Sequence, residues 1–320
     1  MKRTNIAAIT IPIIISLVLF IGILQTGAFS IAQAHETNEV LIPSTEVPLT
    51  AELPEVEETI LEPVEPFMIP TQTASGINVS GEMDSIIDYS NTGDGYVMVS
   101  YYGTTDRNII VIINESNSNL HIFNVTPGQW EVFSLTSGNG VYTIQVGLQI
   151  EGNDYEIINS VDFTVNLNDS LSPFLQSNIK VSYNTDSAVT LKARELTMYT
   201  TDTASKVDII YDFVVNNIVF DRDFANKVSS GEIESYSPDP ERTLSSGKGV
   251  CSDFASLIVA MLRSQGVPAQ MVYGNAEGIF HAWVNVYIDG NWTLLDPTHA
   301  ANGISIEQIQ SQNYQAMYIY

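Results

Sequence analysis

The sequence contains a single cysteine, Cys251, among 320 residues. One thiol cannot form a disulfide within the chain, and it cannot supply a zinc site that needs two or more cysteines. Basic residues are also scarce, with 12 Lys and Arg against 37 Asp and Glu, so the formal net charge at pH 7 is −25. Because binding to DNA or RNA depends on neutralising phosphates with Lys and Arg, the composition argues against a nucleic-acid partner.

The scarcity of basic residues is most pronounced early in the chain, where no Lys or Arg lies between Arg3 and Arg107. Within this gap, the 19 residues 6–24 carry no charge, and the small-residue motif Ala-Gln-Ala follows at 32–34. This order is typical of a secretory signal peptide, and the length of the apolar run also suits a membrane anchor. We therefore expect residues 1–34 to be a cleaved signal peptide or an anchor through residues 6–24. Either would make the protein secreted or hold it on the extracellular face of the membrane.

Two segments of different composition follow. Residues 35–75 contain nine glutamates, several prolines and no Lys or Arg, which predicts a disordered acidic linker. Residues 76–168 contain short alternating apolar runs separated by turns rich in Gly, Asn and Ser, which predicts six or seven strands of an antiparallel β-sandwich. His121 lies in one of these strands without a second ligand at metal spacing, so a structural role is expected.

Residues 169–320 introduce helical periodicity. One helix is predicted from Thr203, as its N-cap, to about residue 218, and a Ser-, Gly- and Pro-containing loop follows Phe220. A second helix begins at Cys251 and ends before Gly266, with one buried stripe formed by Phe254, Leu257, Ile258, Met261 and Leu262. Because a helix N-terminus favours an anion, this position would stabilise a thiolate, and its N–H groups could bind an oxyanion.

A hairpin is predicted at Asp289-Gly-Asn, with His281 at the start of its first strand and Asp296 near the end of its second, roughly level with His281. A carboxylate that accepts a hydrogen bond from one imidazole nitrogen leaves the other nitrogen free to take a thiol proton. Singly, each residue has a structural interpretation: a buried cysteine, a strand histidine and an aspartate that ends a strand. The combination of all three residues favours a catalytic site.

Between residues 190 and 300 the chain contains, in order, Gly247-Lys-Gly-Val-Cys-Ser-Asp-Phe-Ala-Ser-Leu, Met261-Leu-Arg-Ser-Gln-Gly-Val-Pro-Ala, His281-Ala-Trp-Val-Asn-Val and Trp292-Thr-Leu-Leu-Asp-Pro-Thr. These blocks resemble the core of the transglutaminase-like superfamily. The resemblance implies a papain-like α+β fold with Cys251 as nucleophile, His281 as general base and acid, and Asp296 as the residue that orients it. The preceding β-domain resembles that of secreted bacterial members. Nothing matches the calcium sites of animal transglutaminases.

The expected function is that of an extracellular cysteine-dependent acyltransferase or hydrolase acting on protein or peptide amides through a thioester. Cross-linking, deamidation and peptide cleavage remain open, and the alternative is a non-catalytic surface binding or adhesion module. No cofactor or metal is expected, because His299 lies 18 residues after His281 without metal-ligand spacing. Candidate aromatic residues for the walls of a cleft are Tyr236, Tyr273, Trp283 and Tyr287.

Overall fold

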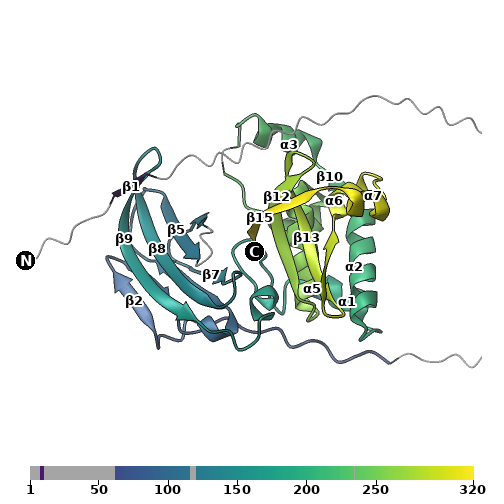
Figure 1. Cartoon of the computed structure of the whole chain (residues 1–320), viewed down its shortest axis with the longest axis horizontal. Helices are drawn as coiled ribbons and strands as arrows, with labels where there is room; N and C mark the ends of the chain where they lie inside the picture. Colours follow the sequence, from purple (N-terminus) through teal and green to yellow (C-terminus); the bar gives the residue numbers. More distant parts are fainter. Residues whose placement is uncertain (1–7, 11–61, 116–119, 234) are drawn as a thin grey trace, which may run out of the picture. The chain divides into compact units, whose positions relative to one another are not determined.

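The computed structural model describes residues 8–10, 62–115, 120–233 and 235–320. Most of the predicted leader, and the predicted linker up to residue 61, lie outside the described residues. Within the described ranges, no helix is both long enough and apolar enough to cross a membrane. The described chain comprises a β-rich region up to residue 165 and a mixed α/β region after it (Figure 1).

The β-rich region contains two antiparallel sheets. The four-stranded sheet has the order β2-β3-β4-β7, with β2 (Val79–Glu82), β3 (Ser85–Asp88), β4 (Tyr96–Tyr101) and β7 (Trp130–Ser134). The five-stranded sheet has the order β1-β9-β8-β5-β6, with β1 (Ala8–Thr10), β5 (Ile109–Glu115), β6 (Leu120–Asn124), β8 (Gly140–Glu151) and β9 (Asp154–Val165). Two 3-10 helices are η1 (Thr92–Asp94) and η2 (Ser172–Leu175).

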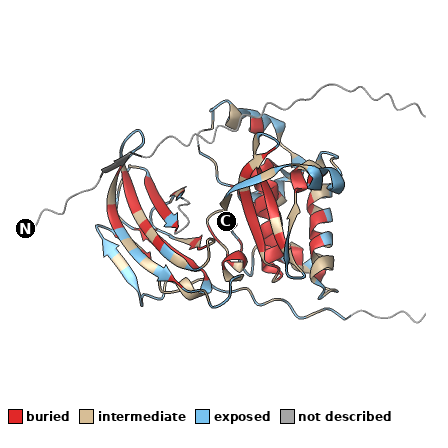
Figure 2. Ribbon diagram, viewed as in Figure 1, coloured by how far each residue is buried: buried red, intermediate tan, exposed pale blue. Residues whose placement is uncertain are grey.

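One apolar core takes residues from both sheets, including Val97 and Val99 of β4 and Ile144 and Val146 of β8. Buried residues alternate with less buried ones along β8 (Figure 2), which is the period-two pattern from which strands are predicted. The sequence pattern missed β2, β3 and the first half of β9, because their Gly, Asp and Glu are depleted in strands. It also missed β1, which pairs with β9 although it lies within the run predicted as a leader. His121 is buried and stacks on Phe123, which agrees with a structural role.

The mixed region contains a four-stranded antiparallel sheet in the order β14-β13-β12-β15, a short parallel pair β10–β11, and seven described helices. The strands are β10 (Val219–Phe220), β11 (Lys248–Gly249), β12 (Ala269–Ala276), β13 (Ile279–Ile288), β14 (Asn291–Leu295) and β15 (Tyr314–Ile319). The helices are α1 (Ala188–Thr197), α2 (Thr203–Asn217), α3 (Arg222–Ser229), α4 (Pro240–Ser246), α5 (Cys251–Ser264), α6 (Pro297–Ala301) and α7 (Ile306–Ser311).

Three local predictions for this region need correction. The N-cap of α2 is Asp202 rather than Thr203, because the Asp202 carboxylate accepts a hydrogen bond of 2.8 Å from the Ser205 N–H. The segment after Phe220, predicted as a loop, contains α3 and α4. Each of these helices begins after an aspartate N-cap, and α4 has Pro240 at its start. The capping signals were therefore present in the sequence, but the helices are short and the segment was predicted as a loop.

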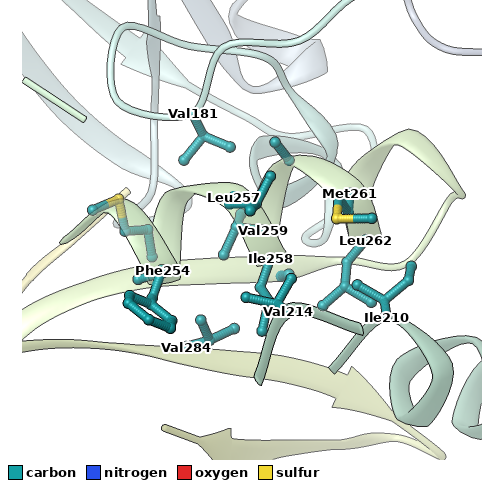
Figure 3. Packing of buried hydrophobic residues seen from close by; sticks show 14 of the residues in the cluster. Val181, Ile210, Val214, Phe254, Leu257, Ile258, Val259, Met261, Leu262 and Val284 are labelled. Carbon is teal, nitrogen blue, oxygen red and sulfur yellow. The ribbon is translucent and has the colours of Figure 1, made fainter. Parts of the chain in front are cut away.

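The third correction concerns α5, which was expected to bury one stripe. All 14 of its residues are buried, because helices α1, α2 and α4 contact it as well as strands β12 and β13. Figure 3 shows Phe254 and Ile258 beside Val284 of β13 and Val214 of α2, with Leu257 directed toward Val181. The helix that begins at Cys251 is therefore held on every side.

The predicted hairpin is present, with β13 and β14 joined at Asp289 and Gly290. Strand β12 pairs with β13 on one side and with β15 on the other, and the pairing with β15 is irregular between Tyr273 and Gly274. A Cβ atom at Gly274 would lie 2.1 Å from the Gln315 carbonyl oxygen, so only glycine allows β15 this close. Gly274 is also the cross-strand partner of His281.

The end of the predicted linker lies on the folded region. Residues 62–75 form no helix or strand. The Val64 N–H donates a hydrogen bond of 2.7 Å to the Met198 carbonyl, and Ile69 packs against the apolar core that surrounds α5. The folded part of the chain therefore begins before Gly76, the residue at which the β-domain was predicted to start.

The burial of α5 predicts an unequal response to truncation of two leucines. Leu257→Ala in α5, at 0% exposure, should lower the free energy of unfolding by about 3 kcal/mol, because it leaves a cavity in the core. Leu191→Ala in α1, at 50% exposure, should change it by less than about 0.5 kcal/mol. Urea unfolding followed by tryptophan fluorescence measures both, and equal losses would contradict the packing described.

Candidate active site

Cys251 is the first residue of α5, directly after the short parallel pair β10–β11. The first hydrogen bonds of the helix run from the Asp253 and Phe254 amides to the Val250 carbonyl, so the amides of Cys251 and Ser252 precede them. The Asp253 carboxylate accepts a hydrogen bond of 2.9 Å from the Val250 N–H, which is the capping role that an acidic residue in the first turn favours. Cys251 itself is 8% exposed.

A second set of contacts fixes this first turn. The Tyr236 hydroxyl donates a hydrogen bond to Asp253 Oδ1, and Arg242 Nη2 lies 3.4 Å from the same oxygen. Burial raises the pKa of Asp253, and these donors together with the Val250 amide oppose that rise. Gly249 leaves room for the carboxylate, since a Cβ there would lie 2.4 Å from the Cβ of Asp253. The two residues before α5, Gly249 and Val250, thus leave space for the Asp253 carboxylate and donate a hydrogen bond to it, respectively.

His281 lies in β13, and its Nε2 is 2.7 Å from Asp296 Oδ2. The sequence predicted that Asp296 lies level with His281 in the paired strands, and this is wrong. The pairing of β13 with β14 ends where Leu295 pairs with Val284. Asp296 instead follows β14 as the N-cap of α6, where its Oδ1 accepts a hydrogen bond of 2.9 Å from the His299 amide. The turn into α6 carries the carboxylate toward His281.

Cys251 lies close enough to His281 for its side chain to raise the pKa of the imidazole, so the structure brings the three predicted residues together. Burial lowers the pKa of His281, but the charge of Asp296, its hydrogen bond and the contact with Cys251 outweigh burial and raise this pKa from 6.5 to about 10. Burial also raises the pKa of Asp296, and His281 outweighs it and lowers that pKa below 3.8. At neutral pH the pair is therefore an imidazolium and a carboxylate.

These shifts have a defined effect on stability. The pKa of His281 is raised above its unfolded value of 6.5, so its contribution is complete below pH 6.5 and is lost as the pH rises through about 10. The pKa of Asp296 is lowered, so its contribution is present above pH 3.8 and is lost as the pH falls through the lowered value. The pair stabilises the fold across the neutral range.

Sequence comparison with protein families agrees with this geometry. The stretch from residue 191 to residue 297, which carries Cys251, His281 and Asp296, matches the model of the transglutaminase-like superfamily. This stretch is a transglutaminase-like domain. The resemblance inferred from the short sequence blocks is thereby confirmed, while the roles of the three residues stay predictions.

Individual relatives cover less of the chain. A UPF0252 protein of Methanocaldococcus jannaschii is 31% identical over 104 residues, which are 30% of this chain and 29% of that protein. An uncharacterized protein of Mycobacterium leprae is 38% identical over 64 residues, which are 16% of this chain and 23% of that protein. The chain thus spans under a third of the length of these curated relatives.

Among solved structures, a proposed cysteine protease of Cytophaga hutchinsonii is similar over 76% of this chain and 78% of that chain, with 18% identity and a TM-score of 0.38. A transglutaminase structure is similar over 48% of this chain and 43% of that chain, with 24% identity and a TM-score of 0.30.

The four aromatic candidates for a cleft wall divide into two pairs. Tyr236 and Tyr273 lie near the first turn of α5, where they interact with Asp253 and Ser252, respectively. Trp283 and Tyr287 instead pack edge-to-face on Tyr314 and Trp292, respectively. Tyr236 and Tyr273 are therefore the two candidates that contact the first turn of α5.

His299 was not predicted to join the site, yet α6 returns it to Asp296 three residues along the chain. The possible ligand atoms of His281, Asp296 and His299 all lie within 4.8 Å of one another, so distance along the sequence does not exclude a metal ion here. His299 Nδ1 is 3.1 Å from Asp296 Oδ2, which is also the acceptor for His281. Asp296 is hydrogen-bonded by His281 Nε2 and by the His299 amide, and the expected absence of a metal stays a prediction.

The coupling of His281 to Asp296 can be measured by NMR titration. The His281 imidazole should titrate with a midpoint near 10 in the unmodified protein. In Asp296→Asn the midpoint should fall toward or below 6.5, because the charge that opposes the effect of burial is removed. Asp289→Asn makes the same chemical change in the hairpin turn and should leave the midpoint unchanged. Identical titrations in all three proteins would contradict the assignment.

Proposed function

We propose that the transglutaminase-like domain is a cysteine acyltransferase or hydrolase that acts on protein or peptide amides through a Cys251–His281–Asp296 triad. The observation that carries the proposal is the 2.7 Å contact between His281 and the buried Asp296 carboxylate, on an imidazole whose pKa the neighbouring Cys251 also raises. A buried acid–base pair attached to a nucleophile is the arrangement that covalent catalysis requires.

The charge state of His281 supports the nucleophilic role of Cys251. Because the pKa of His281 is raised to about 10, its imidazole is positively charged at neutral pH. A cysteine beside a positively charged imidazole and at a helix N-terminus is the arrangement found for activated cysteine nucleophiles. Asp296 bonds Nε2, which leaves Nδ1 of His281 to face the sulfur.

The proposed reaction has two steps. First, the Cys251 sulfur forms a bond with the amide carbonyl carbon, the carbon–nitrogen bond breaks, and His281 gives its proton to the leaving amine or ammonia. Second, an amine or water attacks the thioester and gives its proton to His281, and the carbon–sulfur bond breaks to restore the thiolate. An amine acceptor yields a cross-link, whereas water yields a deamidated or cleaved chain.

The negative charge that develops on the carbonyl oxygen needs hydrogen-bond donors. The Cys251 amide precedes the first hydrogen bonds of α5 and is the donor we assign to this oxyanion. The partial positive charge at the helix N-terminus adds to the same effect. Full burial of α5 holds this donor in place while the sulfur reacts.

We also propose that the reaction takes place outside the cytoplasm, on extracellular protein or peptide amides. This rests on the uncharged residues 6–24, which follow two basic residues and precede the Ala-Gln-Ala motif. N-terminal sequencing of the exported protein tests the proposal, because a chain beginning at His35 shows cleavage and one beginning at Met1 is retained as an anchor.

The single thiol makes nucleophile activation directly measurable. At pH 7, iodoacetamide should alkylate Cys251 about tenfold faster than a small free thiol, because the thiolate is the reactive form. His281→Ala should remove this advantage, and Cys251→Ser should take up no label. If the unmodified protein reacts no faster than the small thiol, the nucleophilic proposal is wrong and the non-catalytic binding module is favoured.

The acceptor can be identified with a glutamine-rich protein and a fluorescent amine. Fluorescence that enters the protein substrate with the unmodified enzyme, but not with Cys251→Ala, would identify amine transfer. Released ammonia or a cleaved chain without fluorescence would identify water as the acceptor. Product formation that is the same with Cys251→Ala would exclude Cys251-dependent chemistry on this substrate.

A further inference from the structure

The Asp296 carboxylate has more partners than the proposed reaction uses. It is 0% exposed, and its Oδ2 lies 2.7 Å from His281 Nε2, 2.8 Å from the Tyr314 hydroxyl and 3.1 Å from His299 Nδ1. Its Oδ1 accepts the His299 amide at 2.9 Å. Only the bond to His281 belongs to the reaction described above.

Tyr314 and His299 also contact each other. The Tyr314 oxygen lies 3.2 Å from His299 Nδ1, so it can accept a hydrogen bond from this nitrogen while its own proton points to Asp296. The His299 ring is stacked on the His281 ring, with centroids 4.6 Å apart and planes inclined by 15°. The carboxylate is thus enclosed by two imidazoles and a phenol.

We propose that Tyr314 is a positioning residue, which holds the Asp296 carboxylate in the rotation that bonds His281, and that His299 fixes the Tyr314 hydroxyl in its donating orientation. This inference rests on the proposed function, because its effect is measured as the reactivity of the Cys251 thiol. The Tyr314 hydroxyl bonds the Asp296 carboxylate, so Tyr314 acts on the thiol through Asp296.

The direction of each hydrogen bond follows from the charges. Burial and the Asp296 charge raise the pKa of Tyr314, so its hydroxyl keeps its proton and donates. Burial lowers the pKa of His299, Asp296 opposes this, and the His281 charge lowers it further. His299 is therefore neutral at pH 7, and Asp296 has one cationic partner rather than two. The other side chain bonded to His299 is the uncharged Gln312.

The fold explains why this residue can reach the site. Tyr314 begins β15, which pairs with β12 beside the strand that carries His281. The close approach of β15 to β12 depends on Gly274, as described above. The Tyr314 ring packs edge-to-face on Trp283, with centroids 5.0 Å apart, which fixes its direction toward Asp296.

The test removes only the hydroxyl. Tyr314→Phe keeps the ring contact with Trp283 but not the hydrogen bond, so the carboxylate can rotate and His281 loses its charge partner. We expect iodoacetamide alkylation of Cys251 at pH 7 to be about tenfold slower than in the unmodified protein, which corresponds to loss of one hydrogen bond to a charged group. Near pH 9 the two rates should converge, because an unassisted thiol ionises there. Tyr318→Phe, on the same strand, should match the unmodified protein.

A double substitution separates positioning from a general structural effect. In an Asp296→Asn background, Tyr314→Phe should change the alkylation rate by less than about twofold, because the group it acts through is gone. The inference is overturned if Tyr314→Phe matches the unmodified protein at pH 7, or if it slows alkylation by the same factor at both pH values or in both backgrounds.

A spectroscopic measurement keeps the inference testable when the thiol proves unreactive. The Nε2 proton of His281, held on the buried carboxylate, should give a low-field NMR resonance. It should broaden or vanish by exchange with water in Tyr314→Phe and persist in Tyr318→Phe. If it is unchanged in Tyr314→Phe, the positioning role is wrong whatever the labelling shows. If it responds while Cys251 labels slowly in the unmodified protein, the nucleophilic proposal fails and the positioning role stands.

Discussion

The site depends on keeping one negative charge away from water. Removing a carboxylate from solvent costs several kcal/mol unless donors and an opposite charge compensate for it. Asp296 obtains this compensation from three elements that are separate in the chain: His281 in β13, the His299 amide in α6 and the Tyr314 hydroxyl in β15. The hairpin, the helix that follows it and the last strand must therefore be in place together.

The position of the Cys251 thiol depends on the packing and hydrogen bonds of α5. Cys251 begins a helix whose surface is covered by apolar packing, and the polar side chains of that helix are bonded inside the fold. Ser256 donates to the Lys180 carbonyl, and Arg263 donates to the carbonyls of Ala269, Gln176 and Tyr320. Because buried polar groups are stable only when they are paired, these bonds fix the rotation of the helix about its axis. The direction of the Cys251 side chain follows from that rotation.

The sequence predicted the features that are set locally. The Asp289-Gly-Asn turn and the start of α5 at Cys251 depend on neighbouring residues, so they could be predicted directly from the sequence. The nearness of His281 and Asp296 was predicted, but their register was not, because it depends on the turn from β14 into α6. His299 and Tyr314 carried no signal of their own. Their contacts with Asp296 arise from the short α6 and from the pairing of β15 with β12, which no local pattern specifies.

The isolation of Cys251 also bears on oxidative damage. A thiolate is the form of cysteine most easily oxidised, and a sulfenic acid is normally rescued by condensing with a nearby thiol. The sequence contains no second cysteine, so an oxidised Cys251 has no resolving partner within it. Recovery would require a thiol supplied by another molecule, and without one oxidation would proceed to the irreversible acids. The limited exposure of Cys251, at 8%, is then a protection for the site as well as a consequence of packing.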